Sequence, residues 1–156
     1  MEKIAVFPGS FDPFTVGHEN IVLRALDLFD RIIVAIGIHS TKKPLLKIES
    51  RVEMVNQVFR GNDKVSADYF EGLTVDYCKK VNATHMVRGI RTSADFEYER
   101  AIAQINKLML PTVESIFLLT TPEHTPVNST IIRDIIRNGG DASQFLPESV
   151  DIKKYL

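Results

Sequence analysis

Short apolar segments alternate along the chain with segments whose apolar residues recur every three or four positions. The apolar segments predict strands, and they span 4–7, 31–37, 65–70, 84–87 and 115–119. The intervening segments have the periodicity of amphipathic helices. Strands that alternate with helices predict an α/β fold, in which a doubly wound five-stranded parallel sheet is built by right-handed crossovers.

The ends of the first two helices are indicated by apolar spacing and by one capping pattern. The apolar positions after residue 18 continue through Leu28 and Phe29, so the first helix is expected to reach them. Ser50 and Glu53 then have the spacing of a capping box, in which each side chain bonds the backbone N–H of the other residue. The second helix is therefore expected to begin there.

The longest helix is expected after 92–95, which offers capping side chains, and before Pro111, which cannot continue a helix. Two polar residues of this segment, Glu99 and Asn106, lie outside its apolar stripe and either line a ligand cleft or face water. The stripe itself consists of Tyr98, Ala101, Ile102, Ile105, Leu108 and Met109.

Composition is that of a globular protein of ordinary charge. With 156 residues, of which 44% are hydrophobic, we expect a single domain over residues 1–156. The net charge of -1 argues against a nucleic-acid or membrane partner, although a local basic cluster could bind a small anion. Residues 1–7 contain no secretory signal pattern, and no apolar run approaches the roughly 18 residues of a membrane span. We therefore expect a cytoplasmic protein whose one cysteine, Cys78, is a core residue.

Residues 6–18 join the first predicted strand to the first predicted helix and contain the first candidate site. Ligands of open α/β sheets bind where a strand ends and a helix begins, because unpaired N–H groups of the helix favour phosphate. His18 stands at that helix start and would lie over a bound anion. The glycines and lysine of the common phosphate and dinucleotide loops are absent. A tight turn with a surface histidine is the alternative.

Further basic residues follow two other predicted strands. Lys42 comes after the second strand, while Arg88 and Arg91 flank a Gly-Ile pair after the fourth. The carboxyl ends of parallel strands lie at the same edge of a sheet. These cations are therefore expected near His18 and near a helix start at 128–130. Guanidinium groups there can hold phosphate oxygens. Solvated side chains are the alternative. The chain lacks Cys/His metal-ligand spacing and a Gly-x-Ser-x-Gly nucleophile pattern, which favours phosphoryl or nucleotidyl transfer.

The segments Gly9–Pro13 and Thr15–His18 resemble the (H/T)xGH loop of the nucleotidyltransferase superfamily, in the form found in bacterial phosphopantetheine adenylyltransferases. The resemblance extends over nearly the whole chain through Lys42, 88–91, 95–99, Asn106 and 145–147. It implies a Rossmann-like nucleotidyltransferase fold. It also implies in-line transfer of the adenylyl group of ATP to 4′-phosphopantetheine without a covalent intermediate, which yields dephospho-coenzyme A and pyrophosphate in coenzyme A biosynthesis. Mg²⁺ as cofactor, coenzyme A as feedback ligand and a homohexamer of two trimers are further implications.

The same resemblance implies a role for each matched residue. His18 would donate to the α-phosphate, Lys42 and Arg88 would hold the phosphate of the acceptor, and Arg91 would face the triphosphate. Catalysis is thus assigned to His18, Lys42 and Arg91, and no residue is assigned as a metal ligand. The residues implied to bind the acceptor are Ser10, Lys42, Thr74, Arg88 and Asn106. Those implied to bind ATP are Ser10, Phe11, His18, Gly89, Ile90, Arg91, Glu99, His124, Thr125, Pro126, Val127, Asn128, Ser129 and Thr130.

Four positions depart from the commonest pattern of the family. Ser10 stands where threonine is frequent, which should preserve the hydroxyl. Thr15 replaces the first histidine of the superfamily motif, His124 stands where tryptophan or tyrosine is frequent, and Asn128 replaces a serine.

Two alternative functions stay open. A cytidylyltransferase or a nicotinamide mononucleotide adenylyltransferase has the same fold, although both motif histidines would be expected there. A sensor that binds ATP or coenzyme A without turnover belongs to a different class.

Overall fold

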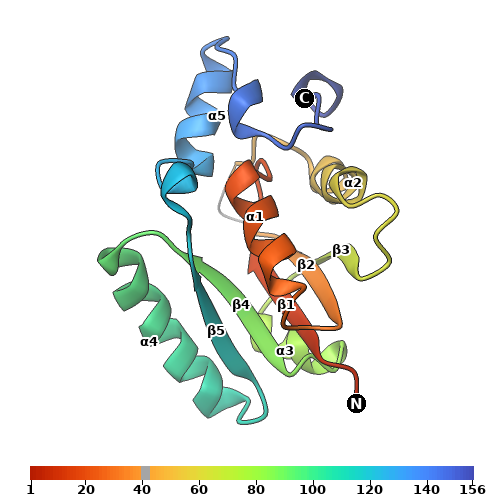
Figure 1. Ribbon diagram of the computed structural model, residues 1–156, viewed down its shortest axis with the longest axis vertical. Coiled ribbons are helices and arrows are strands. Elements are labelled where there is room, and N and C mark those ends of the chain that lie inside the picture. The colour runs from red at the N-terminus through yellow and green to blue at the C-terminus, as the bar shows by residue number, and fades with distance from the viewer. Residues whose placement is uncertain (40–42) are drawn as a thin grey trace.

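The computed structural model describes residues 1–39 and 43–156, and these form an α/β structure around one parallel sheet (Figure 1). The strand order is β3-β2-β1-β4-β5, and every neighbouring pair is parallel. Chain order reverses at β1, which confirms the predicted doubly wound sheet and places its switch point at the end of β1. The strands are β1 (Ile4–Gly9), β2 (Arg31–Gly37), β3 (Val65–Phe70), β4 (His85–Ile90) and β5 (Glu114–Leu119).

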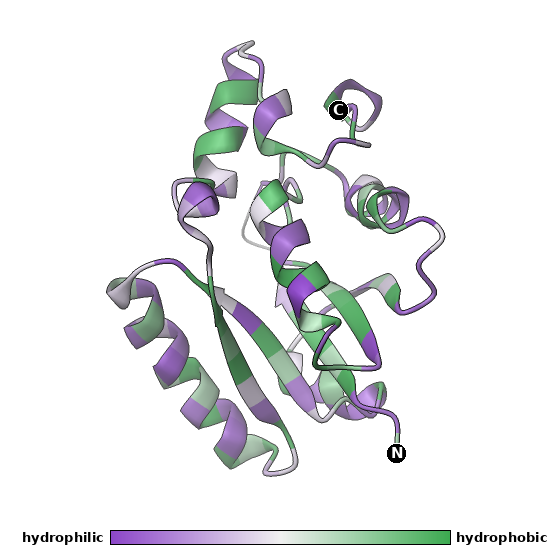
Figure 2. Cartoon of the chain, in the orientation of Figure 1, coloured by the Kyte–Doolittle hydropathy of each residue, from purple (hydrophilic) through white to green (hydrophobic). Residues whose placement is uncertain are grey.

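Helices cover both faces of the sheet. They are α1 (Val16–Ala25), α2 (Ile48–Val58), α3 (Thr74–Lys80), α4 (Ser93–Met109) and α5 (Ser129–Arg137), with 3₁₀ turns at Pro122–His124, Ser143–Phe145 and Ile152–Lys154. Because alternate residues of a strand point to opposite faces, Ala5 and Phe7 pack with α1, α2 and α5, whereas Val6 packs with α3. Figure 2 shows apolar residues concentrated on the central strands, as expected for parallel strands buried on both faces.

The first helix is shorter than predicted. α1 ends at Ala25, and the chain then turns so that Leu28 is half exposed. Phe29 lies beyond the helix, where its buried ring packs against the ring of His85. The expectation that the helix reaches Leu28 and Phe29 is therefore wrong, because Phe29 enters the core from a turn.

The predicted capping box at Ser50 is also wrong. α2 already begins at Ile48, and its N-cap residue Lys47 makes no side-chain cap. The carboxylate of Asp12 instead holds the segment before the helix, because it accepts the backbone N–H of the buried Leu46 at 2.9 Å. A contact between distant parts of the chain thus decides where this helix starts.

β4 extends further than predicted. Its pairing with β5 continues past Val87 to Ile90, so Arg88 and Gly89 lie within the strand. Arg91 is the first residue beyond the strand. The two arginines therefore leave β4 at different heights along the sheet edge.

α4 differs from the other helices because none of its residues is buried. Much of its predicted apolar stripe faces outward, with Tyr98 68% exposed and Leu108 78% exposed. On the opposite side of the helix, Phe96 packs edge-on against Phe117 of β5. Figure 1 shows α4 at the margin of the sheet beside β5, which leaves its apolar stripe at the surface.

Two further expectations concern Cys78 and the membrane. Cys78 is fully buried, as predicted, and burial raises the pKa of its thiol to about 11. Such a thiol stays protonated at neutral pH, which suits a core residue.

Within the described ranges, no helix has the length and apolar character needed to cross a bilayer.

Candidate active site

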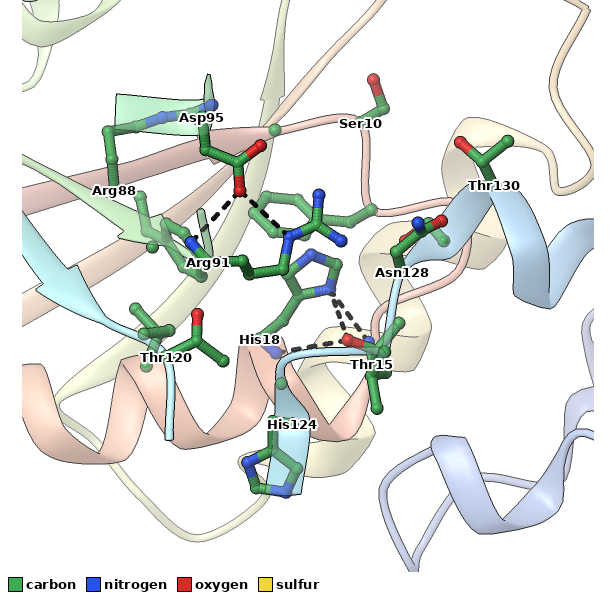
Figure 3. Close-up of a pocket in the computed structure, with 18 of the residues that line it drawn as sticks. Ser10, Thr15, His18, Arg88, Arg91, Asp95, Thr120, His124, Asn128 and Thr130 are labelled. Carbon is green, nitrogen blue, oxygen red and sulfur yellow. Dashed lines mark hydrogen bonds and ion pairs between the residues drawn. The ribbon is translucent and has the colours of Figure 1, made fainter. Parts of the chain in front are cut away.

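Two adjoining cavities lie at the carboxyl ends of β1, β4 and β5. The large cavity, of about 590 Å³, is drawn in Figure 3 and is bordered by the N-terminal ends of α1 and α5. The small cavity, of about 370 Å³, lies between β4, α4 and the start of α3. Ser10, Arg88 and Glu99 line both cavities, so two ligands would meet at these side chains.

Most of the predicted site residues line one of these cavities. The large cavity is lined by Ser10, Phe11, His18, Arg88, Gly89, Arg91, Glu99, His124, Val127, Asn128, Ser129 and Thr130. The small cavity is lined by Ser10, Thr74, Arg88, Glu99 and Asn106. Three predicted residues line neither cavity, namely Ile90, Thr125 and Pro126. Ile90 is buried in the core, and Thr125 Oγ1 donates to the carbonyl of Thr121. Lys42 lies outside the described residues.

His18 is held in one tautomer by Thr15 (Figure 3). The backbone N–H of Thr15 donates to Nδ1 at 3.0 Å, so Nδ1 is the acceptor and the ring proton lies on Nε2. The N–H of His18 donates in turn to Thr15 Oγ1, which completes a capping box at the start of α1. Sequence analysis missed this box because histidine stands where glutamate or glutamine is usual. Nε2–H remains available to a ligand in the large cavity.

The environment of His18 keeps its ring uncharged. Burial lowers the pKa of His18 to about 3, and the positive charges of Arg88 and Arg91 add to this effect. The rings of Phe11 and Phe14 lie 4.9 and 5.4 Å from the imidazole, measured between centroids. In the free protein His18 is therefore a neutral hydrogen-bond donor at neutral pH.

Arg88 is oriented by Glu99. Arg88 Nε and Nη2 donate to the two carboxylate oxygens of Glu99 at 2.9 and 2.6 Å, and Nη1 donates to the carbonyl of Pro8. The Glu99 side chain is only 12% exposed, so this bidentate pair is well shielded from water. A guanidinium has five N–H donors, which leaves two for a ligand at the junction of the cavities.

Arg91 is fixed by a second carboxylate. Its backbone N–H and Nε donate to Asp95 Oδ2 at 3.1 and 3.3 Å, and Asp95 belongs to the first turn of α4, which Thr92 caps. Figure 3 shows the guanidinium of Arg91 reaching into the large cavity. The outer nitrogens of Arg91 are thus directed toward a ligand, while the stem is held.

Side chains from three other elements bind the backbone at the end of β1 and in the loop that follows it, residues 10–15. Their donors come from β4, α2 and α5, which are far apart in the sequence. Arg88 donates to the carbonyl of Pro8, Arg51 to that of Ser10 at 2.9 Å, Arg133 to that of Asp12 at 2.8 Å, and Ser129 to that of Pro13 at 3.0 Å. These bonds fix the loop relative to both cavities.

Sequence analysis did not identify Arg51 or Arg133. Arg133 follows Ser129 by four residues in α5, so helical spacing places both on one side of the helix. Arg51 precedes Met54 and Val55 by three and four residues and therefore occupies a buried position of α2. A charged residue at such a position is a signal of a specific internal partner.

The carboxylates near the large cavity are all engaged. Asp12 accepts two backbone N–H groups, Asp95 accepts from Arg91, and Glu99 accepts from Arg88. Across residues 1–39 and 43–156, His, Cys, Asp and Glu side chains form no cluster of three or more that could hold a metal ion. The described residues therefore do not make a dedicated metal cage.

Comparisons with known proteins agree with this geometry. A protein-family model described as cytidylyltransferase-like matches residues 6–135, which include the loop after β1 and all of β4 and β5. A phosphopantetheine adenylyltransferase from Flavobacterium psychrophilum is 48% identical, and the match covers 96% of this chain and 98% of that protein. One from Leptospira biflexa is also 48% identical, with 99% of each chain covered. The chain belongs to the phosphopantetheine adenylyltransferase family. The resemblance first indicated by the loop at residues 9–18 is thereby confirmed.

Solved structures support the fold of this family member. A bifunctional NMN adenylyltransferase/ADP ribose pyrophosphatase from Francisella tularensis superposes with a TM-score of 0.72 at 20% sequence identity. The match covers 96% of this chain and 46% of that protein, so the chain spans just under half of the bifunctional enzyme. At this identity the likeness concerns the fold, which is the predicted Rossmann-like nucleotidyltransferase fold.

Replacement of Asp12 by alanine should destabilise the fold by about 3 kcal/mol, because the N–H groups of Leu45 and Leu46 lose a charged acceptor. Asp12→Asn keeps one carbonyl oxygen as acceptor and should lose less. Urea unfolding measures both changes. Unchanged stability of Asp12→Ala would contradict the proposed anchoring.

The ring of His18 should stay neutral, with its proton on Nε2, at pH 5 in the free protein. A lowered pKa means that the folded state binds fewer protons than the unfolded state between about pH 6.5 and 3, so stability declines as the pH falls through this range. Nitrogen-15 NMR of labelled histidine observes the tautomer directly. A His18 that protonates near pH 6.5 would show that burial and the two arginines do not act as described.

Proposed function

We propose that this protein transfers the adenylyl group of ATP to 4′-phosphopantetheine, which forms dephospho-coenzyme A and pyrophosphate. The observation that carries the proposal is the pair of cavities joined at Ser10, Arg88 and Glu99, because the reaction requires two phosphate-bearing substrates to meet at one point. The names of the full-length relatives supply the identity of the substrates.

In this proposal ATP occupies the large cavity. Its phosphates would lie over the N-termini of α1 and α5, whose unpaired N–H groups favour anions. Ser129 and Thr130 begin α5, and Arg91 and Thr130 both border this cavity (Figure 3). His124, Val127 and Asn128 would then surround the nucleoside.

The acceptor occupies the small cavity. Its pantetheine arm carries amides and alkyl groups, which suit a wall that combines Asn106 and Thr74 with the apolar side chains of Phe70, Ile102 and Phe117. The acceptor's phosphate would lie at the junction, held by the two remaining donors of Arg88 and by Lys42.

The proposed step is an in-line displacement at the α-phosphorus. An oxygen of the acceptor's phosphate forms a bond to this phosphorus while the bond to the departing pyrophosphate breaks. Because the attacking oxygen is already anionic, no protein nucleophile or general base is needed. His18 Nε2–H donates to an α-phosphate oxygen as charge accumulates there, and a neutral donor does so without losing its proton.

Mg²⁺ is proposed to enter with the triphosphate. The nearby carboxylates are engaged by backbone N–H groups or arginines, so phosphate oxygens and water would supply most ligands of the ion. When bound, the ion would neutralise charge on the departing pyrophosphate. The positioning described above depends only on residues of this chain.

We further propose that residues 1–156 act as one domain in the cytoplasm and assemble into a homohexamer, with coenzyme A as a feedback ligand. The exposed apolar stripe of α4 supports self-association, because isolated proteins rarely leave such a surface uncovered. Neither nucleic acid nor membrane is proposed as a partner.

His18→Ala should lower the turnover number by about 100-fold or more, because one well-placed donor to a developing oxyanion is worth roughly 3 to 4 kcal/mol. Pyrophosphate release with ATP and 4′-phosphopantetheine measures the turnover number. CTP in place of ATP, or nicotinamide mononucleotide in place of 4′-phosphopantetheine, should give little product. His85→Ala, at the far end of β4, is the control. Near-normal turnover by a folded His18→Ala protein would refute the assigned role, and ATP binding without turnover by the wild type would favour a sensor.

Ile105→Lys combined with Leu108→Lys should convert the assembly into smaller species, because both exposed side chains lie on the apolar stripe of α4. Leu28→Lys changes a half-exposed leucine after α1 and should leave the assembly intact. Sedimentation velocity distinguishes these outcomes from the 17.6 kDa monomer. A wild type that sediments as a monomer would refute self-association.

A further inference from the structure

A third cavity, of about 470 Å³, lies beside the loop after β1, next to the end of β2 and between α2 and α5. We call it the basic pocket, because it is lined by the cationic side chains of Lys43, Arg51, Arg133 and Arg137. The chain as a whole has a net charge of -1, so these four cations are a local concentration of positive charge.

Little negative charge opposes these cations. Asp12 is the carboxylate that lines the basic pocket, and its two oxygens already accept N–H groups of Leu45 and Leu46. In the part of the chain that the structure describes, none of the ion pairs involves Arg51, Arg133 or Arg137. The pocket therefore favours an anion.

Arg51 contributes a largely buried positive charge beside this pocket. Its residue is only 6% exposed, and its Nε has no hydrogen-bond partner among the described residues. Burial lowers the pKa of Arg51, an effect that the charges of Asp12 and Glu49 oppose. Buried N–H donors of a guanidinium are rarely left unpaired, since their desolvation is then uncompensated. This nitrogen itself has almost no accessible surface, so a ligand in the pocket would be held by the outer guanidinium nitrogens of Arg51 and by Arg133 and Arg137.

We propose that the basic pocket binds the phosphate group of a small molecule, either free phosphate or a phosphomonoester, at a site that adjoins the large and small cavities and shares Arg133 with the large one. Guanidinium groups match the geometry of phosphate oxygens, and Arg51, Arg133 and Arg137 approach the pocket from two helices. Arg137 and Lys43 line neither of the other cavities, so the site has residues of its own.

An anion in this pocket would act on the loop after β1. Arg51 and Arg133 also donate to the carbonyl groups of Ser10 and Asp12, and Ser10 lines all three cavities. The ligand would therefore contact the same two arginines that hold the loop in place, which couples the basic pocket to the site of the proposed reaction.

Methyl NMR of isoleucine provides a test, because each cavity has its own reporter. Ile48 lines the basic pocket, Ile21 the large cavity and Ile102 the small cavity. The full-length protein is first saturated with a non-hydrolysable ATP analogue and then titrated with inorganic phosphate, or with glycerol 3-phosphate, at constant ionic strength. We expect saturable shifts of Ile48, and the tighter of the two probes identifies the source of the phosphate group.

Arg137→Gln should weaken this binding by roughly threefold or more, since it removes one cationic donor of the pocket. Arg60→Gln removes the same charge from the exposed turn after α2 and should leave the affinity unchanged. Ile21 should keep its response to the ATP analogue in both variants, which separates this site from the proposed reaction. Absence of saturable shifts at Ile48, or equal weakening by both substitutions, would overturn the proposal and indicate non-specific ion binding only.

Discussion

The structure depends above all on how the loop after β1 is held. This loop, residues 10–15, has no regular secondary structure, yet side chains from α2 and α5 donate to its carbonyl groups. Arg88 of β4 donates to the carbonyl of Pro8, at the end of β1 just before the loop. The carboxylate of Asp12 adds bonds to the segment before α2. Since the same loop leads into the helix that presents His18, the position of the His18 ring follows from contacts made by distant elements.

Electrostatics explains why His18 is suited to its place. A protonated imidazole would add another positive charge beside Arg88 and Arg91 in a buried setting, so the neutral form is favoured. Glu99 offsets part of the positive charge of Arg88, and Asp95 does the same for Arg91. Each carboxylate also orients the remaining N–H donors of its arginine. The outcome is a cationic site in which the imidazole of His18 is a neutral hydrogen-bond donor.

Much of the fold could be predicted because buried parallel strands are nearly continuous apolar runs. The same reasoning predicted that the candidate site residues lie at one edge of the sheet, because the carboxyl ends of parallel strands all lie there. The extent of α1 and the start of α2 could not be predicted, because Phe29 packs from a turn and Asp12 bonds residues 33 and 34 positions away. The bonds that hold the loop are likewise tertiary and leave almost no local pattern.

In the proposed reaction, the protein positions two phosphates for one direct displacement. The stereochemical course at the α-phosphorus tests this most directly, with ATP that carries a chiral α-thiophosphate and 4′-phosphopantetheine as acceptor. A single in-line displacement predicts inversion of configuration in the product. Retention of configuration would require two successive displacements through a covalent intermediate and would contradict the account.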